Sequence, residues 1–344
     1  MSLLESDSVD AVRPASEAQF RSHQRREYPP VEEFRPGIWS LAMPYRADVP
    51  YTLSYLIRDD SGGTHLVDPG FDTLQNRQRL TDLLAAIGIE RDGLSSIIVT
   101  HLHGDHLGLG HWLGRCGDTR IHLHAADLDD LSSGDADNRY SNDIASLGDR
   151  WGVPETERGR LSLVLAPSSA TVPDRISLIE DDQLLAIPGR QIRAIQTPGH
   201  TRGHLSFALD DERVLLTGDH VLPGINPGIG RGGVRDDSDP IRDYLASLDR
   251  LEPYDDYEIA PGHGYRFWGL DVRRRQIRAH VLRRAQEVDV ALVTCDDATV
   301  WKIASQLTWS GGADRLEGGR LQSALLQTDL YMRFVRGGGV HESA

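Results

Sequence analysis

Short apolar runs separated by turn residues dominate the first third of the chain. The runs at residues 37–41, 52–57 and 64–67 are bounded by glycine, proline and aspartate, and they predict short strands. Residues 73–87 repeat apolar positions at the spacing of a helix instead. Residues 97–99 are uniformly apolar, which predicts a buried strand. Further along, a short helix is predicted at 107–113 and a strand at 120–123.

The same succession of strands and helices occurs again later in the chain. Strands are predicted at 184–186, 192–195, 205–209, 214–216 and 258–260, with helices at 241–251 and 267–293. The last segment, from about 297 to 336, has only helical spacing. Strands followed by helices, twice over, predict an α+β fold in which two sheets pack face to face with helices outside. We therefore expect a four-layer αββα sandwich with a C-terminal helical extension.

Three segments follow from this pattern. Residues 1–35 are polar and without period, so we expect an N-terminal arm or a disordered lead-in. Residues 36–295 would form the sandwich, and residues 296–344 the helical region. Two polar stretches, 125–170 and 222–239, interrupt the sandwich, and we expect them to form a pocket wall and a lid because long loops in compact domains are usually functional.

Composition narrows the range of partners. The chain has 37 basic and 52 acidic residues, a formal net charge of -15, and such a surface repels nucleic acid on average. It contains no apolar run of membrane-spanning length and no signal-like N-terminus, and its two cysteines give no disulfide framework. We expect a cytoplasmic protein that acts on a small molecule without nucleic acid or membrane. The arm and the helical tail are the candidate contacts of a homodimer.

The densest chemistry lies directly after the strand at 97–99, in the stretch T-H-L-H-G-D-H. His101 and His103 are two residues apart, so at an extended strand end they lie on one side and reach one ion together. Asp105 and His106 follow a glycine, where the chain turns into a helix, and they can address a second ion. Imidazole and carboxylate ligands suit Zn²⁺, with iron and manganese as alternatives.

Three further candidate ligands follow later strands, each beside a glycine. His200 ends T-P-G-H, Asp219 follows T-G, and His263 ends P-G-H. We expect two metal sites, with Asp219 bridging them through its two oxygens. The first site would use His101, His103 and His200, and the second Asp105, His106 and His263.

Four motifs in this order, T-H-L-H-G-D-H, T-P-G-H-T-R-G-H, G-D and P-G-H, resemble those of the metallo-β-lactamase superfamily, over residues 37–265. Within it, the second motif resembles glyoxalase II and the acyl-homoserine lactonases, and the helical tail resembles lactamase-like thioesterases and endonucleases. The resemblance implies the αββα fold, and Asp68 resembles the family's structural aspartate beneath the metals. No cysteine lies near the fourth motif, unlike in several true β-lactamases.

Together these features predict a hydrolase with two Zn²⁺ ions. A bridging hydroxide would attack the carbonyl of a thioester, lactone or activated ester, with Asp105 as both ligand and proton carrier. One alternative is a phosphodiesterase or nuclease of the same fold, against which the acidic surface counts. Another is a metal-binding module that is not an enzyme, against which the complete set of ligand types counts.

Overall fold

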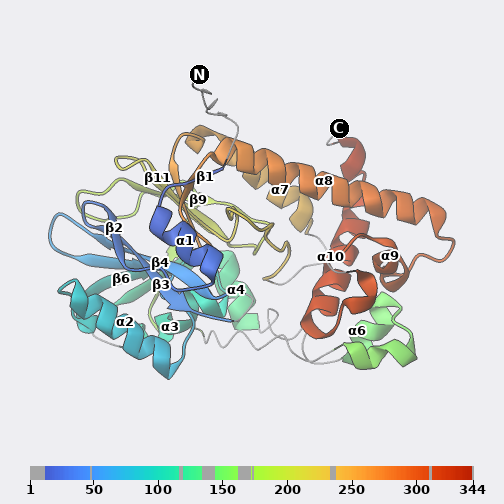
Figure 1. The fold of residues 1–344 in the computed structure, drawn as a ribbon, viewed down its shortest axis with the longest axis horizontal. Helices are drawn as coiled ribbons and strands as arrows, with labels where there is room; N and C mark the ends of the chain where they lie inside the picture. Colours follow the sequence, from blue (N-terminus) through green and yellow to red (C-terminus); the bar gives the residue numbers. More distant parts are fainter. Residues whose placement is uncertain are drawn as a thin grey trace, which may run out of the picture.

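The computed structural model describes residues 12–46, 49–115, 119–133, 144–161, 172, 174–232, 238–309 and 312–342. Within these residues the strands form two sheets, shown in Figure 1. The first sheet runs in the order β2 (Glu32–Arg35), β3 (Ile38–Pro44), β4 (Tyr51–Arg58), β5 (Thr64–Val67), β6 (Leu94–Ile98), β7 (Arg120–His124), β8 (Ile176–Ile179). The second runs in the order β1 (Arg13–Pro14), β13 (Phe267–Trp268), β12 (Glu258–Pro261), β11 (Val214–Gly218), β10 (Leu205–Leu209), β9 (Ile192–Gln196).

Helices cover the outer faces of both sheets. The described helices are α1 (Glu17–Arg25), α2 (Leu74–Ala86), α3 (Gly104–Gly114), α4 (Ala125–Ser133), α6 (Ile144–Trp151), α7 (Pro240–Arg250), α8 (Leu270–Thr294), α9 (Val300–Gln306), α10 (Gly318–Arg336) and α11 (Gly339–Glu342). Four of these described helices begin at a residue whose side chain accepts a hydrogen bond from a backbone amide, as Thr73 does for α2 and Asp239 for α7. The two helix layers and two sheets confirm the predicted αββα sandwich.

Alternation along the strands builds the layers. In β5, Val67 faces the other sheet and packs with Phe207 and Leu216, whereas its neighbour Leu66 faces the helices and packs with Leu80. Successive residues of a strand point to opposite faces, so one short strand contributes to two cores. The burial of nearly every residue in β3, β4 and β10 follows from this position between two apolar layers.

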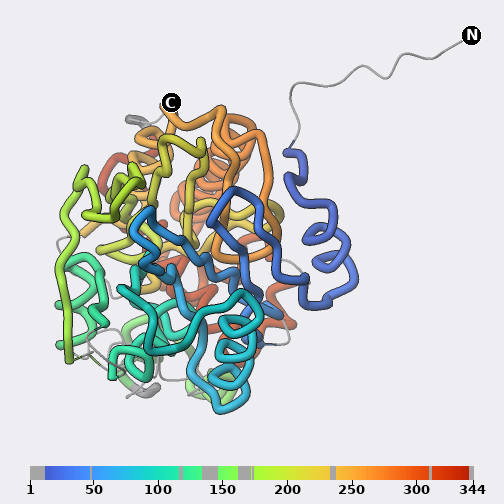
Figure 2. Tube along the Cα trace, turned by 90° about the vertical axis from the view of Figure 1, so that its left-hand side faces the viewer, coloured from blue at the N-terminus to red at the C-terminus, as the bar shows by residue number. Residues whose placement is uncertain are grey.

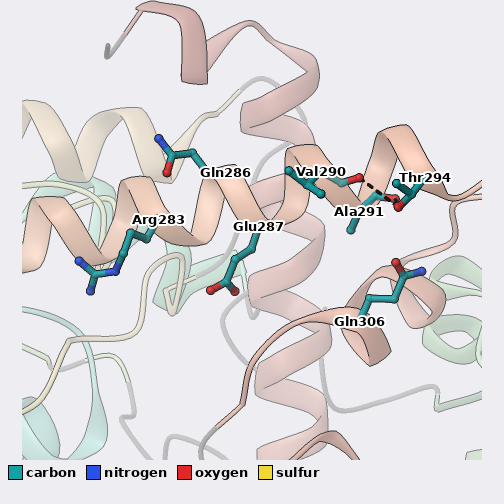
Figure 3. Close-up of a pocket in the computed structure, with 7 residues that line it drawn as sticks. All are labelled: Arg283, Gln286, Glu287, Val290, Ala291, Thr294 and Gln306. Carbon is teal, nitrogen blue, oxygen red and sulfur yellow. Dashed lines mark hydrogen bonds between the residues drawn. The ribbon is translucent and has the colours of Figure 1, made fainter.

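The C-terminal helices share one apolar core with the second sheet. Leu325 and Phe334 of α10 belong to the same buried apolar cluster as Ile259 of β12 and Val281 of α8. An open groove of about 470 Å³ lies between α8 and α9, and Figure 3 shows that Arg283, Gln286, Glu287, Val290, Ala291, Thr294 and Gln306 line it. None of these residues belongs to the predicted metal ligands.

The expectation of an arm at residues 1–35 is wrong for residues 13–35. Strand β1 pairs with β13 of the second sheet, and β2 pairs with β3 of the first. Between them, Gln19 of α1 is 1% exposed, donates to the Ser40 hydroxyl at 2.8 Å and accepts from the Arg266 backbone amide at 2.9 Å. This segment, blue in Figure 2, therefore ties the two sheets together along one side of the molecule. Polar edge strands carry little apolar pattern, which is why the sequence pattern did not predict them.

Two smaller differences from the predicted strands concern residues 176–186, just before β9. Residues 184–186, predicted as a strand, make only one isolated bridge, between Leu184 and Arg193. Leu184 is 48% exposed, and Pro188 soon follows, so the ladder does not continue. Strand β8 was not predicted.

Parts of the predicted pocket wall and lid, residues 134–143, 162–170 and 233–237, lie outside the described residues. Among the helices that are described, none combines the length and apolarity needed to cross a membrane.

Candidate metal centre

The seven predicted ligands all lie just beyond the ends of strands or at the start of a helix. His101 and His103 follow β6, and Asp105 and His106 open α3. The other three follow strands of the second sheet, His200 after β9, Asp219 after β11 and His263 after β12. Ligands from both sheets meet because these strand ends lie at the same end of the sandwich.

The first predicted group is compact. The Nε2 atom of His101 lies 2.8 Å from Nδ1 of His103, and Nε2 of His200 lies 3.0 Å from that same Nδ1. A carboxylate oxygen of Asp219, Oδ2, lies 3.6 Å from His200 Nε2. Together these four residues offer one ligand atom each within 4.8 Å of one another.

The second group is equally compact and shares the other oxygen of Asp219. His263 Nε2 lies 3.3 Å from Asp105 Oδ2, and His106 Nε2 lies 3.6 Å from that oxygen. Asp219 Oδ1 is 3.3 Å from His263 Nε2 and 3.5 Å from His106 Nε2. The structure thus brings all seven predicted side chains together and places Asp219 between the two groups.

The outward nitrogen of each imidazole is held by an acceptor, which fixes where the proton sits. Carbonyl oxygens only accept, so His103 donates Nε2–H to Arg231, His200 donates Nδ1–H to Gly228, and His263 donates Nδ1–H to Tyr51. The three inward nitrogens therefore carry lone pairs when the rings are neutral.

A buried aspartate beneath the cluster does the same for the remaining two rings. Asp68 accepts the Nδ1–H of His106 at 2.8 Å, the Thr100 hydroxyl at 2.7 Å and the Thr100 amide at 2.8 Å. Because the Thr100 hydroxyl gives its proton to Asp68, it accepts from Nδ1–H of His101. The inward nitrogens of His101 and His106 thus also carry lone pairs, and Asp68 orients both rings in the manner of a supporting carboxylate.

This arrangement fits a bound cation. Nitrogen lone pairs 2.8 to 3.0 Å apart repel one another unless a proton or a cation lies between them. In the second group, His106 Nε2 and Asp219 Oδ1 are buried without a hydrogen-bond partner, which is costly unless a metal takes that place. Neutral imidazoles and carboxylates are ordinary ligands of divalent zinc, iron and manganese.

Electrostatics divides the two groups. Burial lowers the pKa of His103 to about 4 and that of His200 to about 3, which keeps both rings neutral. Burial acts in the same direction on His263, but the carboxylates of Asp219 and Asp105 outweigh it and raise the pKa of that ring to about 10. The carboxylates of the second group therefore keep a proton on His263, which a metal ion would displace.

A loop braced by the C-terminal helices supplies the carbonyls that hold His103 and His200. Arg273 of α8 donates to the carbonyls of Leu222 and Ile225, each at 2.6 Å. Gln327 of α10 donates to the Ile229 carbonyl, also at 2.6 Å. Part of the predicted lid, residues 222–232, is thus an anchored support of the first group.

Two further side chains, His204 and Asp127, support the loops that carry the ligands. His204 accepts a hydrogen bond from the backbone amide of Asp219 on its Nε2 atom, at 3.2 Å. Asp127, inside the predicted polar insertion, is 0% exposed. Its carboxylate accepts hydrogen bonds from the two loops that carry the histidines of the first group, at residue 102 and at residues 201 and 203. An aspartate near the start of a helix is typical of an ordinary capping residue, so no sequence signal marked Asp127.

The fold and the ligand geometry agree with a family comparison. The sequence profile of the metallo-beta-lactamase superfamily matches residues 47–263, which contain all seven side chains. The chain belongs to the metallo-beta-lactamase superfamily. Among solved structures of the superfamily's fold, a metallo-beta-lactamase family protein from Thermus thermophilus is 26% identical, with a TM-score of 0.73 over 89% of this chain and 95% of the other. A beta-lactamase domain protein from Burkholderia ambifaria has the same TM-score of 0.73 at 23% identity, over 96% of this chain and 94% of the other.

Curated relatives in the superfamily match only part of their own length. "Lactamase-like protein adaB" of Aspergillus niger is 27% identical over 66% of this chain and 54% of its own length. A hydroxyacylglutathione hydrolase of Rhodopseudomonas palustris is 27% identical over 61% of this chain and 62% of its own. An atrochrysone carboxyl ACP thioesterase of Aspergillus fumigatus is 27% identical over 66% of this chain and 55% of its own length. The chain therefore spans little more than half the length of these relatives.

Proposed function

We propose that the protein is a hydrolase that binds two divalent metal ions and cleaves a thioester, lactone or activated ester of a small molecule. The observation that carries this proposal is the convergence of five imidazole lone pairs and two carboxylates, all buried or nearly so, on two adjacent groups. Two of the relatives, a hydroxyacylglutathione hydrolase and an ACP thioesterase, have names that denote cleavage of an acyl compound, which supports the substrate class.

In this proposal the residues of the cluster form two ion-binding groups that share Asp219. The rings of His101, His103 and His200 would hold one ion, and Asp105, His106 and His263 the other, with Asp219 shared. Two such ions, when bound, supply a Lewis acid for a carbonyl oxygen and a water whose pKa is lowered toward neutrality. The hydrogen bonds on the outward nitrogens keep the five rings in the tautomer and orientation that this requires.

Asp105 is the residue that we propose to carry a proton. Its Oδ2 atom faces His263 Nε2 at 3.3 Å and accepts the Thr52 hydroxyl at 3.3 Å, so the carboxylate is oriented from two sides. Apart from the shared Asp219, the rest of the described cluster consists of imidazoles, and with the ions bound their remaining protons point away from its centre. A thiolate or the anion of an activated ester departs without a strong acid, and the alkoxide of an opened lactone takes up the proton that Asp105 carries, which is why thioesters, lactones and activated esters head the list.

The test is metal analysis followed by a substrate panel. Metal content of the purified protein is measured for zinc, iron and manganese, and hydrolysis of a thioester, a lactone, a β-lactam and bis-p-nitrophenyl phosphate is measured with and without chelator. We expect His103→Ala to lower kcat/KM on the best acyl substrate by more than about 100-fold, as removal of a ligand should. His280→Ala, which removes an imidazole on α8 outside the cluster, is the matched control.

Retention of full turnover by His103→Ala, or turnover insensitive to chelator, would refute the assigned roles. Preferential cleavage of bis-p-nitrophenyl phosphate would favour the phosphodiesterase alternative. A protein that binds metal and hydrolyses none of the panel would favour the metal-binding module.

A further inference from the structure

A second buried carboxylate, besides that of Asp68, supports the cluster through the neighbouring backbone. Asp127 is the third residue of α4 and is 0% exposed. It is not one of the residues whose atoms form the two ligand groups. A buried carboxylate is costly to keep unless it is well bonded, so its partners indicate what it does.

The carboxylate of Asp127 joins the two histidine loops. Its Oδ2 accepts the backbone amide of Leu102 at 2.8 Å and the Thr201 hydroxyl at 3.1 Å, and its Oδ1 accepts the backbone amide of Gly203 at 2.7 Å. Leu102 lies between His101 and His103, and Thr201 directly follows His200. One side chain therefore bonds to both stretches of backbone that carry the first ligand group.

The contact is close enough to exclude even a methyl group. A Cβ atom built on Gly203 would lie 2.6 Å from the Asp127 amide nitrogen and 2.6 Å from its Oδ1. Real Cβ atoms do not approach so closely, so the glycine permits the loop to reach the carboxylate. Residue 203 therefore needs to be glycine for this hydrogen bond to form.

The two supporting carboxylates divide the cluster between them. Asp68 bonds to His106 and to Thr100, next to His101. Asp127 bonds to no imidazole and instead fixes the backbone on either side of the first group. The separation of His200 from His103, whose facing nitrogens are 3.0 Å apart, depends on the relative placement of these two loops.

We propose that Asp127 is a positioning residue of the metal centre, which holds the His101–His103 loop against the His200 loop and so sets how tightly the first group binds its ion. The inference rests on the proposed metal-dependent function. It concerns one residue that touches neither metal nor substrate, and acts through the backbone of its neighbours.

In the experiment, the metal-free protein is titrated with Co²⁺, and binding is followed through the ligand-field absorption spectrum and through competition with a chelator. Asp127→Asn keeps the size of the side chain but offers an amide NH₂ group to donors, so at least one of the three bonds is lost. We expect it to weaken the binding of an ion by about 10- to 100-fold and to change the cobalt spectrum. Thr201→Val removes one bond only and should weaken binding by a few-fold.

Asp59→Asn is the matched control. Asp59 is also buried and accepts backbone amides, from Ser61 and Gly63, but it lies at the β4–β5 turn and bonds to none of the histidine loops. It should lower stability without changing cobalt affinity or the spectrum. A purely structural role of Asp127 would produce the same behaviour in Asp127→Asn.

The outcomes separate the inference from the function on which it rests. A wild-type protein that binds no Co²⁺ overturns the proposed function. A wild-type protein that binds Co²⁺, with Asp127→Asn unchanged in affinity and spectrum, overturns the role of Asp127 alone. If Asp127→Asn does not fold, Thr201→Val decides, and wild-type affinity and spectrum in that variant overturn the inference.

Discussion

Gly262 lies against two ligands of the cluster, Asp219 and His106, so Gly262→Ala should disturb both groups. A Cβ atom there would lie 2.6 Å from Asp219 Oδ1, 2.7 Å from His106 Cε1 and 3.1 Å from the Gly218 carbonyl carbon. The backbone cannot move away easily, because the Gly262 amide donates to the Gly218 carbonyl and its own carbonyl accepts from Leu53, each at 2.7 Å. The added methyl group must therefore displace the shared carboxylate or the His106 ring.

Overpacking of a fixed site of this kind costs about 1–3 kcal/mol. For a chain of this length that corresponds to a fall in Tm of a few degrees for the metal-free protein. The same displacement moves ligand atoms by tenths of an ångström or more, and metal affinity should fall along with stability. We expect a loss of affinity of about tenfold or more, since about 1.4 kcal/mol corresponds to a factor of ten.

Thermal unfolding of the metal-free protein and chelator competition measure the two effects. Gly224→Ala is the control, because a Cβ atom at that position has no neighbour within 4 Å. Wild-type Tm and metal affinity in Gly262→Ala would refute the close packing on which the description of the cluster depends. Equal losses in Gly224→Ala would show that the effect is not specific to the cluster.

Metal affinity should depend both on the proton held by His263 and on the bond that supports the loop at residues 222–232. His263, whose pKa burial lowers but Asp219 and Asp105 raise to about 10, keeps its proton at pH 7 in the metal-free protein and must lose it to bind an ion. Metal affinity should therefore rise with pH from 7 toward 10, by up to about tenfold per pH unit for one released proton. Calorimetry in buffers of different ionisation enthalpy should detect that proton. An affinity independent of pH would contradict this prediction. Gln327→Ala removes the bond to the Ile229 carbonyl, worth about 1 kcal/mol, and should weaken metal binding a few-fold in the same competition assay. Gln306→Ala, in the α8–α9 groove, is its control, and equal affinities of the two variants would argue against the support role.

The ligand types, and the separation of His101 and His103 from Asp105 and His106, could be predicted because they depend on local geometry. His101 and His103 lie two residues apart at a strand end, and a turn places Asp105 and His106 at the start of α3. The apolar strands before His200, Asp219 and His263 predicted that these residues would lie at an edge of a sheet. Sequence order alone was enough for these statements.

The supports of the ligands could not be predicted in this way. The carbonyls of Tyr51, Gly228 and Arg231 orient three imidazoles, and a carbonyl is present in every residue, so no residue type marks it. Asp127 is one of several aspartates in its region, and only its burial against two distant loops distinguishes it.

The edges of the fold show the same limit. The apolar runs of β4, β5 and β10, bounded by turn residues, predicted these strands almost to the residue, since a strand between two cores is buried on both faces. Strands β1 and β2 are short, polar and at the edges of the sheets. Each is held by pairing with the next strand of its sheet, β1 with β13 and β2 with β3.

By itself, then, the sequence determined which elements form and which side chains can bind an ion, because both follow from contacts between residues close along the chain. Only the tertiary structure decided that seven side chains from two sheets lie within a few ångströms, and which backbone groups and buried carboxylates hold them there. These contacts join residues as far apart as Tyr51 and His263, and their distances depend on how every layer between them packs.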